Sequence, residues 1–397
     1  MSRRRLFASL CSLVFLVNLA RVVFAPLLEP IAADFGVTVG SLGVVVSAAW
    51  LGSALPRVPT GWLLTRVPRH RVIVGAGCVL TAAAALAAAA PSVPLLAAGG
   101  FLMGLASGVY FIAANPLVSE LFPDSVGRAL GIHGMASQVS AAGASLIVIA
   151  VVAVFGGWRA TFLVMAVAAA LVTVGLFLVA RRTDLPDAGS RDRDLLAAAR
   201  AQLPIILTGV LVTGSVGFVW NGLFNYFPTY MGTKGLDQST ARLMLSIVFA
   251  AGIPAFLFGG QLADRLSNVP LILGVVGGFV VCLFAFPYAT GLWPLAVASV
   301  ALGYVVHSLF PVMDTYLLGS LPDHHRASAY TAYSATMMLP QSMGGVVVGS
   351  LTDAGVPFDT LYTGFAVALT FVLFALLALY VAGRLPVGNV GDAQPSV

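Results

Sequence analysis

The hydrophobic positions of this chain form long uninterrupted runs, and the polar positions gather in short stretches between them. A helix of about 20 residues crosses the roughly 30 Å of hydrocarbon in a bilayer, and most runs have that length. The alternating ten-residue pattern of a membrane β-barrel is absent from the sequence. We therefore expect an all-α polytopic membrane protein with twelve transmembrane helices. The predicted spans are residues 6–28, 41–63, 72–91, 94–118, 129–154, 160–180, 204–230, 243–263, 269–290, 292–318, 327–350 and 359–382.

The composition narrows the class of protein. Hydrophobic residues make up 59% of the chain and charged residues 9%, whereas an ordinary globular protein carries about 25% charged residues. This excludes a cytosolic enzyme, a disordered chain and a secreted disulfide scaffold. The three cysteines, Cys11, Cys78 and Cys282, lie alone in apolar segments without metal-ligand spacing, so neither a metal nor a cofactor is expected. The first apolar run contains Asn18 and Arg21 and lacks a cleavage pattern, which indicates a retained helix rather than a signal peptide.

The basic residues predict the orientation. With both termini inside, only Arg159, Lys234 and Arg242 fall in outer loops. Inner loops then hold fifteen arginines, namely Arg3, Arg4, Arg5, Arg66, Arg69, Arg71, Arg128, Arg181, Arg182, Arg191, Arg193, Arg200, Arg265, Arg326 and Arg384. This positive-inside bias favours cytoplasmic termini, and an arginine-rich chain that contains one lysine fits the plasma membrane of a prokaryote. Because these arginines cluster at loop ends, topology explains the pI near 9.3 and no nucleic-acid partner is expected.

The chain contains an internal repeat at an offset of 199 residues. Gly61 to Arg66 recurs as Gly260 to Arg265, and the pair Pro123-Asp124 recurs as Pro322-Asp323. Between the copies lies one long polar stretch, which reads as a cytoplasmic linker. We expect a six-helix half at residues 1–182, a linker at 183–202 and a second six-helix half at 203–397. Parallel repeats of this kind are typical of transporters whose substrate site lies near the bilayer midplane.

On these motifs the chain resembles the major facilitator superfamily over essentially its whole length. The G-x-x-x-D-R loop pattern is complete at Gly260, Asp264 and Arg265, and its first-half copy keeps Gly61 and Arg66 but has Thr65 at the acidic position. The resemblance implies two pseudo-symmetric six-helix bundles and alternating access, with a gating role for these motif residues. It also implies that helices one, four, seven and ten line a central cavity. Supporting matches are Phe122-Pro123-Asp124, Gly127-Arg128 and Trp158-Arg159.

Two arginines lie inside predicted spans, where a charge at the bilayer centre costs about 2.5 to 3.5 kcal/mol. Arg21 lies one turn after Asn18 in the first helix, and it either faces the cavity to grip an anion or snorkels to the headgroups. Arg57 either binds the anion or pairs with a helix end. The string from Arg57 to Gly61 resembles helix two of nitrate and nitrite porters. Since Phe256 stands 199 residues later, where those porters would supply a second arginine, nitrate remains a minor hypothesis.

Helix ten carries the candidates for proton coupling. Asp314 is the only acid well inside a predicted helix, and His307 lies seven residues, or two turns, before it, with Tyr304 expected on the same stripe. A buried carboxylate or an imidazole can bind and release a proton near neutral pH. The alternatives are a hydrogen-bonded packing histidine and a structural salt bridge. The resemblance implies that Arg21, His307 and Asp314 share one chamber.

Weaker polar stripes supply further candidate ligands. Asn221 and Asn225 lie one turn apart in helix seven, and Tyr330 and Gln341 belong to a stripe in helix eleven. Interhelical hydrogen bonds, worth about 0.6 kcal/mol each, explain any one of them without a role in binding. We expect the substrate to contact Asn18, Arg21, Arg57, Asn221, Asn225, Tyr304, Tyr330 and Gln341.

The function predicted from these features is secondary transport. The sequence has no phosphate-binding loop and no recognisable nucleophile context, so neither an ATP-driven pump nor an enzyme with catalytic residues is expected. Arg21 and Arg57 outnumber Asp314, which favours a small anion moved with or against protons. The expected partners are thus a small-molecule substrate, the lipid bilayer and protons, with no obligatory protein partner. Two alternatives remain: proton-coupled efflux of hydrophobic compounds, and a transporter-like sensor that binds without moving its ligand.

Overall fold

The computed structural model describes residues 2–123, 126–183, 185, 195–263 and 265–386. Within these ranges every regular element is a helix. The first half contains α1 (Ser2–Val22), η1 (Ala25–Leu27), α2 (Leu28–Phe35), η2 (Gly40–Leu42), α3 (Gly43–Ala54), α4 (Arg57–Leu63), α5 (Arg69–Ala88), α6 (Val93–Leu121), α7 (Val126–Phe155) and α8 (Arg159–Ala180). The second half contains α9 (Leu195–Ala201), α10 (Leu203–Gly209), η4 (Val210–Gly214), α11 (Ser215–Asn225), α12 (Phe227–Thr233), α13 (Gln238–Ala263), α14 (Asn268–Ala285), η5 (Phe286–Tyr288), α15 (Leu292–Ser320), α16 (Asp323–Asp353) and α17 (Phe358–Val381).

The predicted all-α membrane fold is confirmed. In the described part of the chain, eleven stretches are helical, long enough and apolar enough to cross a bilayer. The twelfth crossing is α16, which has 31 residues and, apart from α1, is the least apolar of the long helices because polar side chains run along it. Its expected span, 327–350, lies inside these bounds.

Three spans that hydropathy predicts as single helices are interrupted. The first ends at Val22 and continues as η1 and α2, and the second breaks at Leu55–Pro56 because proline has no N–H to donate to the preceding turn. The seventh is divided into α10, a π-helical turn at 210–214, α11 and α12. Hydropathy averages over a window and does not register such breaks. The predicted linker also contains regular structure, since α9 packs against α16 with Ala198 buried.

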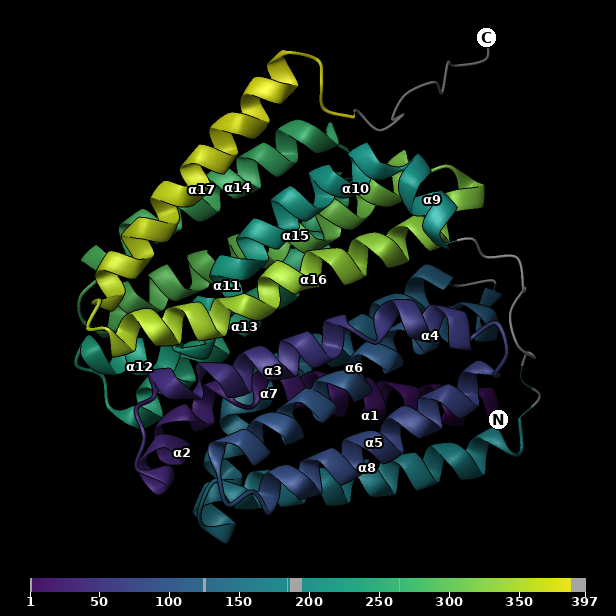
Figure 1. Cartoon of the computed structure of the whole chain (residues 1–397), viewed down its shortest axis with the longest axis horizontal. Helices are drawn as coiled ribbons and strands as arrows, with labels where there is room; N and C mark the ends of the chain where they lie inside the picture. Colours follow the sequence, from purple (N-terminus) through teal and green to yellow (C-terminus); the bar gives the residue numbers. More distant parts are fainter. Residues whose placement is uncertain (1, 124–125, 184, 186–194, 264, 387–397) are drawn as a thin grey trace.

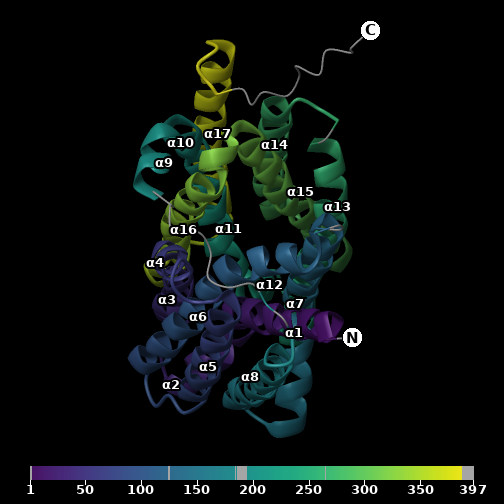
Figure 2. The same cartoon turned by 90° about the vertical axis from the view of Figure 1, so that its right-hand side faces the viewer.

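The two halves form two bundles, one below the other in Figure 1 and again in the rotated view of Figure 2. The offset of 199 residues seen in the sequence recurs in the helix boundaries: α5 and α14 begin 199 positions apart, as do α8 and α17. The helices α6 and α15 share this offset at both ends. Because α1 begins and α17 ends on one side of the molecule (Figure 1), we name that side the linker side and the opposite side the far side.

The bundles touch along a seam on the far side, formed by Gly40, Gly43, Gly345 and Gly349 together with Tyr226. The Tyr226 hydroxyl contacts the carbonyl oxygens of Gly40 at 3.3 Å and Gly345 at 3.2 Å. Small residues let helix backbones approach this closely in a membrane. Beside this far-side seam, the Val346 amide donates to Ser47 Oγ at 2.9 Å, and Thr38 donates to Asp353 at 2.9 Å. The far side is therefore closed.

Candidate functional site

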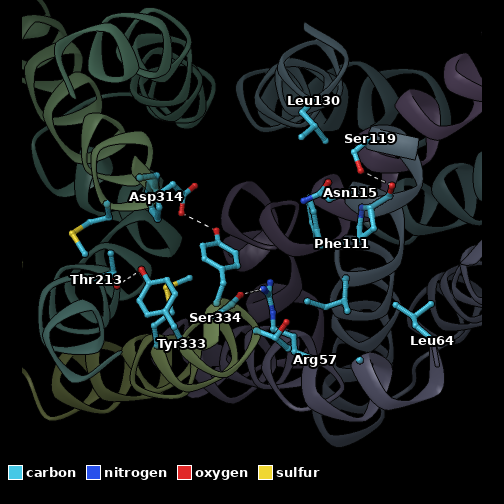
Figure 3. A pocket seen from close by; sticks show the side chains of 18 of the residues that line it. Arg57, Leu64, Phe111, Asn115, Ser119, Leu130, Thr213, Asp314, Tyr333 and Ser334 are labelled. Carbon is cyan, nitrogen blue, oxygen red and sulfur yellow. Dashed lines mark hydrogen bonds between the residues drawn. The ribbon is translucent and has the colours of Figure 1, made fainter. Parts of the chain in front are cut away.

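A cavity of about 600 Å³ lies between the two bundles (Figure 3). Its wall reaches Leu64 and Ser119, near the linker-side ends of α4 and α6. The first half contributes Arg21, Arg57, Phe111 and Asn115 among others. The second half contributes Thr213, Phe256, Phe310, Asp314, Tyr330, Tyr333 and Ser334. Both halves therefore build the same site.

Arg57 crosses from one bundle to the other. It is the first residue of α4, directly after the break at Pro56, and its Nε donates to the carbonyl oxygen of Ser53 at 3.1 Å. Its Nη1 donates to Ser334 Oγ on α16 (Figure 3). The side chain is 8% exposed. The guanidinium is thus held at the cavity wall by two neutral oxygens.

Arg21 is held by a second set of neutral groups near the end of α1. Its Nη2 donates to Asn18 Oδ1 at 2.6 Å, and the Asn18 amide donates in turn to the Ser137 carbonyl at 2.8 Å. The guanidinium lies over the rings of Trp50 and Phe111, 5.0 and 5.1 Å from their centroids. Its buried Nε has no hydrogen-bond partner among the described residues. Asn18 therefore orients a cation that keeps part of its hydrogen-bonding capacity free.

Neither arginine is neutralised by an acid in the described part of the chain. The ion pairs found there are Arg69 with Glu120, Arg159 with Asp34 and Lys234 with Asp359. All three lie near helix ends and away from the cavity wall. An isolated charge in a low-dielectric interior is costly unless it meets an opposite charge or hydrogen bonds. The cavity therefore holds cationic groups whose charge is unmatched.

Asp314 is the acidic group on the described cavity wall. The Tyr330 hydroxyl donates to Asp314 Oδ1 at 2.8 Å. Tyr330 and Ser334 are four residues apart and so lie on one face of α16. Through these two side chains, one turn of α16 forms hydrogen bonds with both Asp314 and Arg57. Figure 3 shows Asp314 and Arg57 on opposite walls of the open space.

The structure does not bring His307 to this wall. The histidine is 3% exposed, and its Nδ1 pairs with the Gly303 carbonyl at 2.7 Å within the same helix. Its ring packs against Trp220 and Phe249, with centroids 5.4 and 5.5 Å apart. This arrangement is the packing alternative considered for His307, and the expectation of one chamber shared with Arg21 and Asp314 is corrected for this residue.

Tyr304 is also placed elsewhere. It lies in a separate groove of α13, α14 and α15, together with Gly259 and Gly274. Three residues of α-helix rotate a side chain by 300°, so Tyr304 faces about 60° away from His307. The expectation of one common stripe is therefore wrong for Tyr304.

Of the remaining predicted ligands, Asn221, Asn225 and Gln341 are buried and do not line the cavity. Asn225 Nδ2 donates to the Asn221 carbonyl at 2.6 Å, and both side chains are buried. Gln341 donates to the carbonyl oxygen of Thr213 at 3.1 Å, inside the π-helical turn. Tyr330, in contrast, lines the cavity. Asn221 Nδ2 and Asn225 Oδ1 are buried without a hydrogen-bond partner among the described residues, so these amides are only partly satisfied.

The residues of the loop motif lie at the linker side. Gly61 borders the cavity, and the Arg66 guanidinium stacks on the Trp62 ring at 3.8 Å. Gly260 has open space around its Cα, while Arg265 borders the groove that contains Tyr304. Asp264 lies outside the described residues.

Sequence reasoning missed the aromatic part of the wall, because phenylalanine is as common in lipid-facing positions as in a cavity. The repeat offers a signal that could have found it. Arg57 and Phe256 are 199 positions apart, as are Phe111 and Phe310, and all four line the cavity. Asn115 and Asp314 form a third pair of this kind, in which only the second half carries an ionisable group.

Comparisons with known proteins agree with this architecture. The family model described as Major Facilitator Superfamily matches residues 10–292 and 242–394. The chain is 28% identical to a chloramphenicol resistance protein of Streptomyces lividans, over 75% of this chain and 74% of that protein. It is 24% identical to the gentisate transporter of Corynebacterium glutamicum, over 75% and 71%. It is also 24% identical to the niacin transporter NiaP of Acinetobacter baylyi, over 90% and 88%.

Solved structures share the fold at low sequence identity. The nucleoside transporter NupG superposes with a TM-score of 0.80 and 14% identity, covering 94% of this chain and 100% of the other. A bacterial homologue of the lysosomal transporter Spinster, in an inward-facing and occupied conformation, gives a TM-score of 0.77 and 17% identity, with 96% of both chains covered. In the described part of the chain, twelve membrane crossings form two repeated bundles with a cavity between them. Together with the family match along the chain, this shows that the multi-pass membrane protein belongs to the major facilitator superfamily of secondary transporters.

Proposed function

We propose that this protein moves a small organic anion, coupled to protons, through the cavity between its bundles. The observation that carries the proposal is the pair of arginines, Arg21 and Arg57, which line one cavity and have no acidic partner among the described residues. Guanidinium groups present planar sets of donors that match carboxylates and related anions. An anion that binds there supplies the missing opposite charge.

Two of the relatives support an anionic substrate. Gentisate and niacin, for which the transporters of Corynebacterium glutamicum and Acinetobacter baylyi are named, are both carboxylic acids and carry a negative charge at neutral pH. The identities of 24% leave the substrate of this chain open, so the charge on the cavity wall remains the main support.

Asp314 is the proposed proton carrier. Its carboxylate shares the cavity with Arg21 and Arg57, and the hydroxyl of Tyr330 holds it in place. A proton bound at Asp314 removes a negative charge that competes with the substrate for the arginines. Binding of the anion and binding of the proton therefore favour each other, and by thermodynamic linkage this coupling is reciprocal. Mutually favourable binding drives symport, with both species crossing together. His307 is not part of this proposal, because its ring packs against Trp220 and Phe249 and does not border the cavity.

The proposed orientation places the linker side in the cytoplasm of a prokaryotic cell, with both termini inside, as the distribution of arginines predicts. A closed far-side seam and a cavity that extends toward the linker side then correspond to an inward-facing state. We propose residues 1–182 and 203–397 as the two moving halves and residues 183–202 as their linker. The motif residues Gly61, Arg66, Gly260, Asp264 and Arg265 would then act at the cytoplasmic gate.

Efflux of uncharged hydrophobic compounds is the second candidate. The aromatic part of the wall favours it, as does the similarity to a chloramphenicol resistance protein. The two buried arginines argue against it, because an uncharged cargo leaves their charge unmatched.

Flux measurements separate these functions. Purified protein is reconstituted into vesicles with an imposed inward proton gradient, and uptake of radiolabelled acetate, sulfoacetate, nicotinate and benzoate is measured beside that of chloramphenicol. The proposal predicts gradient-driven accumulation of at least one anion. Movement of chloramphenicol alone would favour efflux, and binding of an anion without accumulation would indicate a sensor.

A further inference from the structure

The geometry of the cavity points to a narrower substrate class, and we infer that the anion is a carboxylate on a single aromatic ring. The carboxylate would lie between Arg21 and Arg57, and the ring would lie against Phe256 and Phe310. This inference rests on the proposed anion transport and specifies which anion fits.

The unoccupied donors of the two arginines suit a carboxylate. Arg21 uses Nη2 on Asn18, and no hydrogen bond within the described residues engages its Nη1. Arg57 uses Nε on Ser53 and Nη1 on Ser334, and no hydrogen bond within the described residues engages its Nη2. A carboxylate has two oxygens in one plane and accepts from several N–H groups at once. Each arginine that lines the cavity therefore keeps a donor for such a group.

Aromatic rings from both halves border the cavity. The rings of Phe256 and Phe310 lie parallel within 7°, with centroids 6.2 Å apart, and both border the cavity. Phe111 and Tyr330 add two more rings to the wall. Aromatic groups pack favourably against such surfaces at centroid separations of about 4.5 to 7 Å.

The repeat places a cation in the first half and an aromatic ring in the second half at equivalent positions. Arg57 of the first half and Phe256 of the second half occupy positions 199 residues apart and face the same space. Pseudo-symmetry would have produced two like groups, yet one half presents a cation and the other an apolar ring. At this pair of equivalent positions, a ligand with one anionic end and one apolar end suits both halves. The cavity of about 600 Å³ has ample space for one ring together with water.

Four probes test the two ends of this ligand separately. Benzoate carries the ring and the charge, acetate the charge alone, benzyl alcohol the ring alone, and benzylammonium the ring with the opposite charge. Binding to the purified full chain is measured by titration calorimetry and by thermal stabilisation, since a ligand of the folded state raises its stability. We expect benzoate to bind at least about tenfold more tightly than acetate, and the other two probes to give no stabilisation.

Matched variants test whether the preference for benzoate over acetate arises in the cavity. Phe256→Leu should weaken benzoate binding about threefold to tenfold and leave acetate binding unchanged, while Phe256→Tyr, which keeps the ring, should restore most of the affinity. Phe258→Leu is the control, because Phe258 is two residues away on the same helix and is 56% exposed outside this cavity. Arg57→Gln should weaken both anions. Arg181→Gln, at the end of α8, should weaken neither.

The results separate a failure of the aromatic substrate class from a failure of anion transport. If acetate binds as tightly as benzoate, or if Phe256→Leu weakens both equally in a protein that remains folded by its melting curve, the aromatic class is wrong while anion transport stands. If neither benzoate nor acetate binds, and the anions of the flux assay are not moved either, both proposals fail.

Discussion

Gly349 of α16 and Gly40 of η2 are in backbone contact across the two bundles: a Cβ atom added to Gly349 would lie 2.2 Å from the Gly40 carbonyl oxygen. The same atom would lie 2.4 Å from the Tyr226 hydroxyl. A methyl group at this position requires the helices to separate, because backbone atoms cannot rotate away as a side chain can. The closed far side therefore depends on the absence of a side chain.

Gly349→Ala should open the far-side seam. Overpacking of this kind costs about 1 to 3 kcal/mol, which shifts a two-state equilibrium by about fivefold to about 150-fold toward the conformation that relieves it. Pulsed electron resonance can measure the separation between spin labels at Val37→Cys and Ala354→Cys, in a background with the three native cysteines replaced by serine. We expect a larger fraction of long distances than in the parent protein.

Gly364→Ala is the matched control for this change, because no atom lies within 4 Å of a Cβ added to Gly364. Its distance distribution should equal that of the parent. An unchanged distribution in Gly349→Ala would show that the seam does not limit opening.

Arg21→Lys should weaken anion binding although the charge is kept. Lysine lacks the planar fork of guanidinium and cannot use Asn18, Trp50 and Phe111 in the same way. We expect affinity to fall about tenfold for Arg21→Lys and less for Asn18→Ala, which removes the acceptor for Arg21 and the donor to the Ser137 carbonyl but keeps the guanidinium. Titration with benzoate measures both, and unaltered affinity in the two variants would make Arg21 a structural cation.

Asp314→Asn should uncouple transport from protons. The amide can still accept from Tyr330 but binds no proton in this pH range, so uptake should no longer respond to an imposed proton gradient. Exchange of labelled for unlabelled substrate, which needs no net proton movement, should persist. A variant that still accumulates substrate under the gradient would exclude Asp314 as the carrier.

Tyr330→Phe and Tyr304→Phe make a paired comparison. Each removes one hydroxyl from a tyrosine of the second half, yet only Tyr330 borders the cavity and holds Asp314. The pH at which uptake is half-maximal should therefore shift in Tyr330→Phe and stay constant in Tyr304→Phe. Equal pH profiles for both variants would argue that the Tyr330 hydroxyl does not tune the proton site.

Asp34 should contribute a pH-dependent part of stability. Its carboxylate accepts from Arg159 and from Trp158 Nε1 at 3.2 Å, and the hydrogen bond with Arg159 lowers the pKa of Asp34 below its ordinary value. A depressed pKa stabilises the fold above the unfolded-state value, near 3.9, and this gain is lost as pH falls through the folded-state pKa. Asp34→Asn should lower the melting temperature slightly at pH 7, and this difference should shrink as the pH falls through the folded-state pKa. Melting curves measured from pH 7 down into the acid range provide the check.

The fold was predictable because the membrane imposes it. Each crossing must satisfy its own backbone hydrogen bonds and needs about 20 apolar residues, whatever its neighbours are. The breaks at Pro56 and at residues 210–214 were not predictable, since they depend on how a helix packs rather than on its mean hydropathy. The helix α9 was missed for the same reason, as its burial against α16 is a tertiary contact.

The charged part of the site followed from a similar physical constraint. Arg21, Arg57 and Asp314 are too costly to face lipid, so they were expected to face a common polar space. His307 and Asn225 were less predictable, because a backbone carbonyl one turn earlier pairs with a side-chain nitrogen of each. Phe256 and Phe310 carry no such cost anywhere in a membrane protein, and only the structure shows that they face the cavity.

The glycine contacts of the far-side seam also indicate where the energy for switching must come from. Tightly packed backbone atoms attract by dispersion, which neither dissolved salt nor acidity of the medium alters appreciably, whereas exposed ion pairs weaken with ionic strength. The strength of this closure should thus be nearly the same on either face of a living membrane. Ionisable groups outside the glycine contacts, such as Asp353 beside the seam and Asp314 in the cavity, are therefore where acidity or a ligand can act on the switch.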